Sequence, residues 1–191
     1  MRNLAIAAAA AMVLLAGRGG VAEADAGNTE RLVGLLAERL ATADTVAAIK
    51  WEAAVRDGGE PVIDDPGREA AIYDAMAQAG AERGLPGGRV REVFHGQIEA
   101  NKIVQRGLMT EWRYGLAAAQ VPGTDLAGVR PVIDGLNTVI LDELASERKE
   151  LAEANCPTRV AAGVVAVAGS KQLDALHSAS LARASTPLCG G

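Results

Sequence analysis

The sequence contains few of the side chains that most often carry enzyme chemistry. Histidine and cysteine occur twice each, as His95, His177, Cys156 and Cys189, and their spacing matches no metal-ligand pattern. There is no glycine-rich phosphate loop, and two histidines so far apart make a Ser-His-Asp arrangement hard to build. An enzyme with this sequence is therefore expected to work without a metal, a nucleotide or a covalent nucleophile.

Strand signals are nearly absent as well. Apolar residues recur at three- and four-residue intervals, and the abundant Ala, Leu, Arg and Glu all favour helices. The sequence predicts an all-α fold, a single helical-bundle domain of about six helices. The expected helices span residues 28–56, 66–83, 88–114, 125–154, 157–168 and 171–185. Because proline cannot donate to the helical ladder, Pro131 is expected either in the first turn of the fourth helix or at a kink in it.

Only one apolar run is long, and it lies at the N-terminus. It extends over 13 residues from Leu4 to Ala16, whereas a bilayer span needs roughly 20. Arg2 precedes it, and the small-x-small pattern Ala22-Glu23-Ala24 follows. This order is typical of a signal peptide. The sequence predicts a signal peptide over 1–24, cleavage after Ala24, and a secreted or periplasmic mature domain over 25–191; an uncleaved anchor is the alternative.

The mature chain would have no basic surplus. Without residues 1–24 it has 17 basic and 23 acidic side chains. A net charge of −6 argues against nucleic acid or an anionic membrane as a partner, because both attract basic surfaces.

Cys156 and Cys189 both lie in the mature part. Export would place them in an oxidising compartment, so the sequence predicts a disulfide between them. Closing a loop of this length stabilises a chain by roughly 3–4 kcal/mol in the chain-entropy model. Two free thiols or an intermolecular bridge are the alternatives.

Polar side chains occur beside the apolar faces of two predicted helices. Arg39 and Lys50 are 11 residues apart, which places them on nearly the same face of the first helix. Asn101 and Gln105 form an i, i+4 pair on the third helix. Such residues can form interhelical salt bridges and polar contacts in the core, or they can line a pocket for an anion.

Five segments, in this order along the chain, resemble the active-site segments of the AroQ-type chorismate mutases. They are AERL at 37–40, VAAIKW at 46–51, DDPGR at 64–68, VFHGQIEAN at 93–101 and DLAGVR at 125–130. The expected signal peptide, the mature length and the two late cysteines are similar to the secreted gamma subclass. The resemblance implies the AroQ helical fold and an enzyme that rearranges chorismate to prephenate without a cofactor.

The resemblance also implies roles for single residues. Arg39, Arg68 and Arg130 would hold the two carboxylates of chorismate, because a guanidinium matches a carboxylate in a bidentate manner. Lys50 and Gln105 would lie on either side of the ether oxygen, whose negative charge grows as its C–O bond breaks. Arg39, Lys50 and Gln105 are thus the expected catalytic residues, and no metal site is expected.

Three further residues are expected to bind substrate. Asn101 stands where the family has a small hydroxyl residue, and Asp65 and Glu69 are candidates for the substrate hydroxyl. Two positions depart from the secreted members. Gln105 stands where those have glutamate, and Ile72 stands where a polar contact is expected, for which Glu69 would substitute.

The position of Arg130 in this chain bears on whether a partner subunit must contribute to the site. Small cytoplasmic members of the family borrow an arginine from a partner chain, whereas this chain would supply Arg130 from its own fourth helix. A homodimer with a complete site in each protomer is therefore expected by analogy. Two other functions remain as alternatives: an isochorismate-pyruvate lyase, and an exported helical binding protein derived from an inactive mutase.

Overall fold

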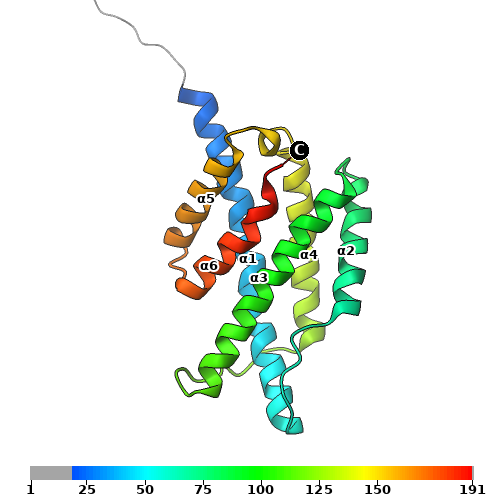
Figure 1. The fold of residues 1–191 in the computed structure, drawn as a ribbon, viewed down its shortest axis with the longest axis vertical. Coiled ribbons are helices and arrows are strands. Elements are labelled where there is room, and N and C mark those ends of the chain that lie inside the picture. The colour runs from blue at the N-terminus through cyan, green and yellow to red at the C-terminus, as the bar shows by residue number, and fades with distance from the viewer. Residues whose placement is uncertain (1–18, 191) are drawn as a thin grey trace, which may run out of the picture.

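The computed structural model of the protein describes residues 19–190, with side chains from residue 27 onward. Within this range the chain forms helices and no strand, so the predicted all-α class is confirmed (Figure 1). The α-helices are α1 (Gly19–Asp57), α2 (Pro66–Ala81), α3 (Gly87–Arg113), α4 (Leu126–Ser146), α5 (Cys156–Ser170) and α6 (Ala175–Ser185). Two short 3-10 helices, η1 (Glu150–Ala152) and η2 (Thr186–Leu188), follow α4 and α6.

Local signals in the sequence set most of the helix ends. Asp65, Asp125 and Asp174 precede α2, α4 and α6, and each carboxylate accepts the backbone N–H three residues further on, at 2.8–3.0 Å. Pro66 follows the first of these caps, in the first turn of α2. Gly58 ends α1 with a φ of +68°, a conformation that glycine adopts without strain.

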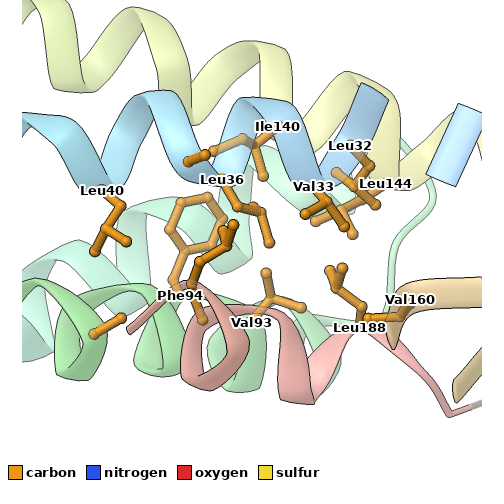
Figure 2. Close-up of a cluster of buried hydrophobic side chains, with 14 of the residues drawn as sticks. Leu32, Val33, Leu36, Leu40, Val93, Phe94, Ile140, Leu144, Val160 and Leu188 are labelled. Carbon is orange, nitrogen blue, oxygen red and sulfur yellow. The ribbon is translucent and has the colours of Figure 1, made fainter. Parts of the chain in front are cut away.

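The core forms where α1 and α3 cross. Leu32, Leu36 and Leu40 of α1 are buried against Val93 and Phe94 of α3 (Figure 2). Helices α4, α5 and α6 also pack on α1, and α6 covers α3. Helix α2 packs on α3 and α4 instead (Figure 1). Helix α1 is thus surrounded by α3, α4, α5 and α6, whereas α2 is held by α3 and α4.

The predicted disulfide is present. Cys156 and Cys189 are bonded, which ties the start of α5 to the segment after η2. Cys156 is buried in the core cluster, and Cys189 packs against it. The bond therefore joins the start of α5 to the segment that follows α6 and η2.

The predicted fourth helix is too long. It was expected to reach residue 154, but α4 ends at Ser146 and the chain turns through η1 before α5. The Arg159 guanidinium donates a hydrogen bond to the Glu150 carbonyl, which a continuous helix would have used for its own ladder. Tertiary contacts therefore override the helix propensity of this segment. Pro131 lies inside α4, beyond its first turn.

Two other boundaries also differ. Helix α6 begins at Ala175 rather than at residue 171, because Gln172 adopts a φ of +53° and Asp174 provides the cap. Helix α1 begins at Gly19, so the expected cleavage site after Ala24 falls within its first two turns. Most of the predicted signal peptide, residues 1–18, lies outside the described residues. Between residues 19 and 190, no helix has the length and apolar character to cross a membrane.

A buried carboxyl group makes the stability of this fold depend on pH. Burial raises the pKa of Glu147 to about 7, and the neighbouring Glu143 carboxylate adds to the effect. The folded state therefore retains a proton that the unfolded chain releases near pH 4.5. The stabilisation that Glu147 contributes is fully present below that pH and is lost as pH rises through about 7.

Glu147→Gln is expected to remove this dependence. The amide keeps the shape of the side chain and does not titrate, so the variant should be more stable than the parent at pH 8 by on the order of 1–3 kcal/mol. Urea unfolding at pH 5 and pH 8 measures the difference. Glu52→Gln on the exposed face of α1 is the control. An equal stability difference at the two pH values would contradict the expectation.

Candidate active site

A cavity of about 740 Å³ opens between the second half of α1, the first turns of α2 and α4, and the middle of α3. The segment 58–65, which joins α1 to α2, also contributes to its wall. Every residue that the sequence analysis placed in a substrate site lines this cavity. These residues are Arg39, Lys50, Asp65, Arg68, Glu69, Asn101, Gln105 and Arg130.

Arg39 is the most deeply buried cation of the site. The residue is 4% exposed, and its Nε donates a hydrogen bond to Asn137 Oδ1 at 2.7 Å. The guanidinium lies over the Phe94 ring, 5.9 Å from the centroid. Burial lowers the pKa of Arg39 to about 10, so the group stays charged at neutral pH. Among the described residues, no carboxylate pairs with it.

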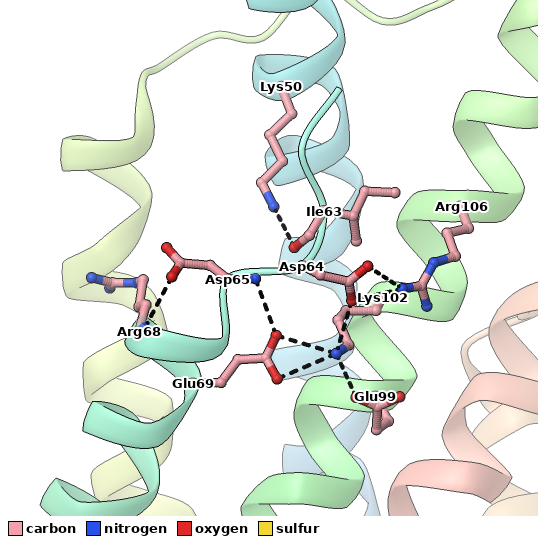
Figure 3. A network of polar contacts seen from close by, with 9 residues as sticks. All are labelled: Lys50, Ile63, Asp64, Asp65, Arg68, Glu69, Glu99, Lys102 and Arg106. Atoms are coloured by element: carbon pink, nitrogen blue, oxygen red, sulfur yellow. Dashed lines mark hydrogen bonds and ion pairs between the residues drawn. The ribbon is translucent and has the colours of Figure 1, made fainter. Parts of the chain in front are cut away.

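Lys50 reaches the same cavity from three turns further along α1. Its Nζ donates to the carbonyl oxygen of Ile63 at 3.2 Å (Figure 3). Burial lowers the pKa of Lys50, and the carboxylates of Asp64 and Asp65 partly oppose this shift. Within residues 27–190, its ammonium forms no ion pair.

The other two arginines lie at the edge of the cavity. Arg68 is in the first turn of α2, where its backbone N–H is capped by Asp65, and Arg130 is in the second turn of α4. Both residues are exposed. Neither guanidinium pairs with a carboxylate in the part of the chain that the structure describes. Four helix positions thus direct cations at one cavity, and none of these four cations forms an ion pair within the described residues.

Two amide side chains complete the wall on α3. Asn101 and Gln105 are both buried, one turn apart. Asn101 Nδ2 and Gln105 Oε1 have no hydrogen-bond partner among the described residues. A ligand in the cavity can supply the partners, an acceptor for Asn101 Nδ2 and a donor for Gln105 Oε1.

Lys102 is a residue of the cavity that the sequence analysis missed. Its Nζ contacts three carboxylates, those of Glu99, Asp64 and Glu69 (Figure 3). Ile72 also lines the cavity and provides an apolar surface there. The only local sign of the lysine's role was its i, i+3 spacing from Glu99, which usually indicates a surface pair.

This arrangement can bind a small molecule that carries more than one negative charge. Guanidinium groups from three helices provide bidentate partners for carboxylates. Lys50 and Gln105 add single donors for an oxygen atom between them. The cavity is built from residues far apart in the sequence, so it forms only when the helices have packed.

Comparisons with known proteins point to one family. The profile of the family "Chorismate mutase type II" matches residues 26–106. A protein of Mycolicibacterium smegmatis named "Secreted chorismate mutase" is 33% identical over 165 residues, which cover 86% of this chain and 88% of that protein. A protein of the same name from Mycobacterium tuberculosis is 28% identical, over 83% of this chain and 76% of that protein.

The fold has relatives among solved structures too. The crystal structure of a chorismate mutase from Burkholderia phymatum superposes with a TM-score of 0.80 and 37% sequence identity. The match covers 88% of this chain and 99% of that one.

Proposed function

This chain belongs to the AroQ-type chorismate mutases, and from that membership we propose how its cavity rearranges chorismate to prephenate. The reaction is unimolecular and needs neither proton transfer nor a covalent intermediate. The protein has two tasks. It selects the compact conformer of a flexible substrate, and it stabilises the charge that develops on the ether oxygen in the transition state.

The arginines perform the first task. Arg39, Arg68 and Arg130 bind the two carboxylates of chorismate and hold its ends in the reactive geometry. The observation that carries this proposal is Arg39, a buried guanidinium with no carboxylate partner among the described residues. A buried charge is costly unless an opposite charge accompanies it, and a substrate carboxylate meets this need.

Lys50 and Gln105 perform the second task. The ammonium of Lys50 is a compact charge suited to a single oxygen atom, and the Gln105 amide is a neutral donor on the opposite wall. Lys50 donates to the Ile63 carbonyl, so its ammonium lies at the cavity wall with one N–H group directed at an oxygen. The Asp65 and Glu69 carboxylates lie on the α2 side and bind the substrate hydroxyl, and Asn101 lines the α3 wall.

The direct test is turnover by the purified protein. Incubation with chorismate is expected to consume the substrate, which absorbance measures, and to yield prephenate. Isochorismate in a parallel reaction should release no pyruvate. Pyruvate release would instead support the lyase alternative, and binding of chorismate without turnover would support a binding protein.

Gln105→Glu is expected to make the activity depend on acid. The amide of Gln105 donates at any pH, so the parent should have a flat pH profile near neutrality. A carboxyl at this position donates only when protonated, so the activity of the variant should fall about tenfold for each pH unit above the pKa of the introduced group.

Measurements of kcat from pH 4.5 to pH 8.5 test this expectation. Gln78→Glu, on the exposed face of α2, is the matched control and should keep the parent profile. An unchanged profile for Gln105→Glu would mean that this side chain does not contact the ether oxygen.

We further propose that the protein is exported and acts as a homodimer. The predicted signal peptide over 1–24 and the disulfide both suit an oxidising compartment, and the similar mycobacterial proteins are named as secreted. Mass spectrometry of the exported protein should find Asp25 at the N-terminus. All eight expected site residues line the cavity of a single chain, so each protomer would hold a complete site.

A further inference from the structure

We propose that Lys102 is a positioning residue, whose ammonium fixes the Glu69 carboxylate and the Asp64 end of segment 58–65 against the cavity. This inference deepens the proposed function, because it assumes that Glu69 binds the substrate hydroxyl. Lys102 is on α3, and the two carboxylates belong to α2 and to the segment before it (Figure 3). One side chain therefore joins three parts of the cavity wall.

The geometry accounts for every donor of the lysine. Nζ is 2.6 Å from Glu99 Oε1, 3.1 Å from Asp64 Oδ1, and 3.2 and 3.3 Å from the two oxygens of Glu69. An ammonium has three N–H groups, and here three carboxylates accept from them. The residue is only 9% exposed, so solvent screens these contacts less than it screens surface pairs.

Ion pairing also distinguishes Lys102 from the cations that are proposed to bind substrate. Arg39 and Lys50 form no ion pair among the described residues, whereas Lys102 already has three. Burial by itself would lower the pKa of Lys102, but its hydrogen bonds to the carboxylates outweigh this effect and raise it. Lys102 is thus neutralised within the protein and acts on substrate through Glu69.

Glu69 is held from two sides. Its Oε1 accepts the backbone N–H of Asp65 at 3.3 Å, and Lys102 binds both of its oxygens. Asp64 is held in a similar manner by Lys102 and by Arg106, whose Nη2 lies 2.7 Å from Oδ1. The segment before α2 is therefore fixed to α3 at the point where it adjoins the cavity.

Charge balance indicates why the position needs a cation. The cavity is lined by equal numbers of basic and acidic side chains: Arg39, Lys50, Arg68, Lys102 and Arg130 against Asp57, Glu60, Asp64, Asp65 and Glu69. Without Lys102 the lining would be net negative, and its carboxylates would repel one another and a substrate with two carboxylates. Lys102 places a positive charge directly against the Glu69 carboxylate.

Lys102→Met tests the inference through steady-state kinetics. The KM for chorismate is expected to rise by about 10- to 100-fold, because a small misplacement of a binding group has effects of this size. The hydroxyl contact exists in both the ground state and the transition state, so kcat should change much less than KM. Lys102→Arg, which keeps the charge, should recover most of the loss. Lys171→Met, which removes a surface partner of Glu38, is the matched control.

A double variant distinguishes positioning from direct contact. If Lys102 acts through Glu69, Lys102→Met should add no further loss of kcat/KM in a Glu69→Gln background. The double variant leaves two rather than three carboxylates without the ammonium, so their repulsion is smaller and it remains informative if Lys102→Met alone does not fold. An additive loss, or a KM unchanged in a folded Lys102→Met, would overturn the inference. Substantial activity in Lys50→Ala would instead overturn the proposed mechanism itself.

Discussion

Lys50→Ala is expected to lower kcat by about 100- to 1,000-fold, because removal of one preorganised donor to a developing oxyanion has effects of this size. The loss should fall on kcat rather than on KM, since the negative charge on the ether oxygen is larger in the transition state than in the ground state. Lys50 forms no ion pair among the described residues, so its truncation leaves no carboxylate unpaired. Chorismate consumption followed by absorbance measures both parameters.

Folding must be unaffected for this result to be interpreted. Far-UV circular dichroism and thermal unfolding of Lys50→Ala should match the parent, since the lysine side chain has a single hydrogen bond within the described residues, to the Ile63 carbonyl. Lys149→Ala, an exposed lysine in the turn before η1, is the matched control and should retain full activity. If Lys50→Ala keeps more than about one tenth of the parent kcat, the ammonium does not stabilise the transition state.

Arg39→Met is expected to reduce kcat/KM by about 100- to 1,000-fold while changing the free energy of unfolding little. The substrate carboxylate would lose a buried, charged partner, and such a loss is worth roughly 2–5 kcal/mol. The effect on folding has two opposing parts. The Asn137 amide oxygen loses its donor, but the chain no longer has to bury a guanidinium that lacks an internal anion.

Urea unfolding and steady-state kinetics of the same sample separate the two effects. Arg56→Met is the control on the same helix, where the arginine is exposed and pairs with Glu52. It should change neither quantity by much, because exposed ion pairs contribute little. If Arg39→Met were strongly destabilised with kcat/KM intact, Arg39 would be a structural residue rather than a substrate ligand.

The sequence was a reliable guide where the signals are local. Helix caps at Asp65 and Asp125 depend on a side chain and an N–H three residues apart, and the structure contains both. The placement of Arg39 and Lys50 on one face follows from helical geometry over three turns. Both side chains therefore line the same cavity, as expected.

The sequence was a poor guide where a distant contact outweighs a local preference. The segment 147–154 has good helix formers, yet α4 stops at Ser146 and the Leu151 carbonyl accepts the N–H of the distant Gly190. Likewise, Lys102 and Glu99 have the spacing of an ordinary surface pair. Only the approach of α2 brings Asp64 and Glu69 to the same ammonium.

The scarcity of histidine and cysteine argued against metal and nucleophilic catalysis, and the helical periodicity predicted the fold class. The order of the cationic segments then pointed to the family. The tertiary structure decided which cations are paired: Arg39 and Lys50 form no ion pair among the described residues, and Lys102 forms three. The reason is physical, since periodicity assigns a side chain to a face of its own helix, and only the packing of that helix determines which groups lie opposite.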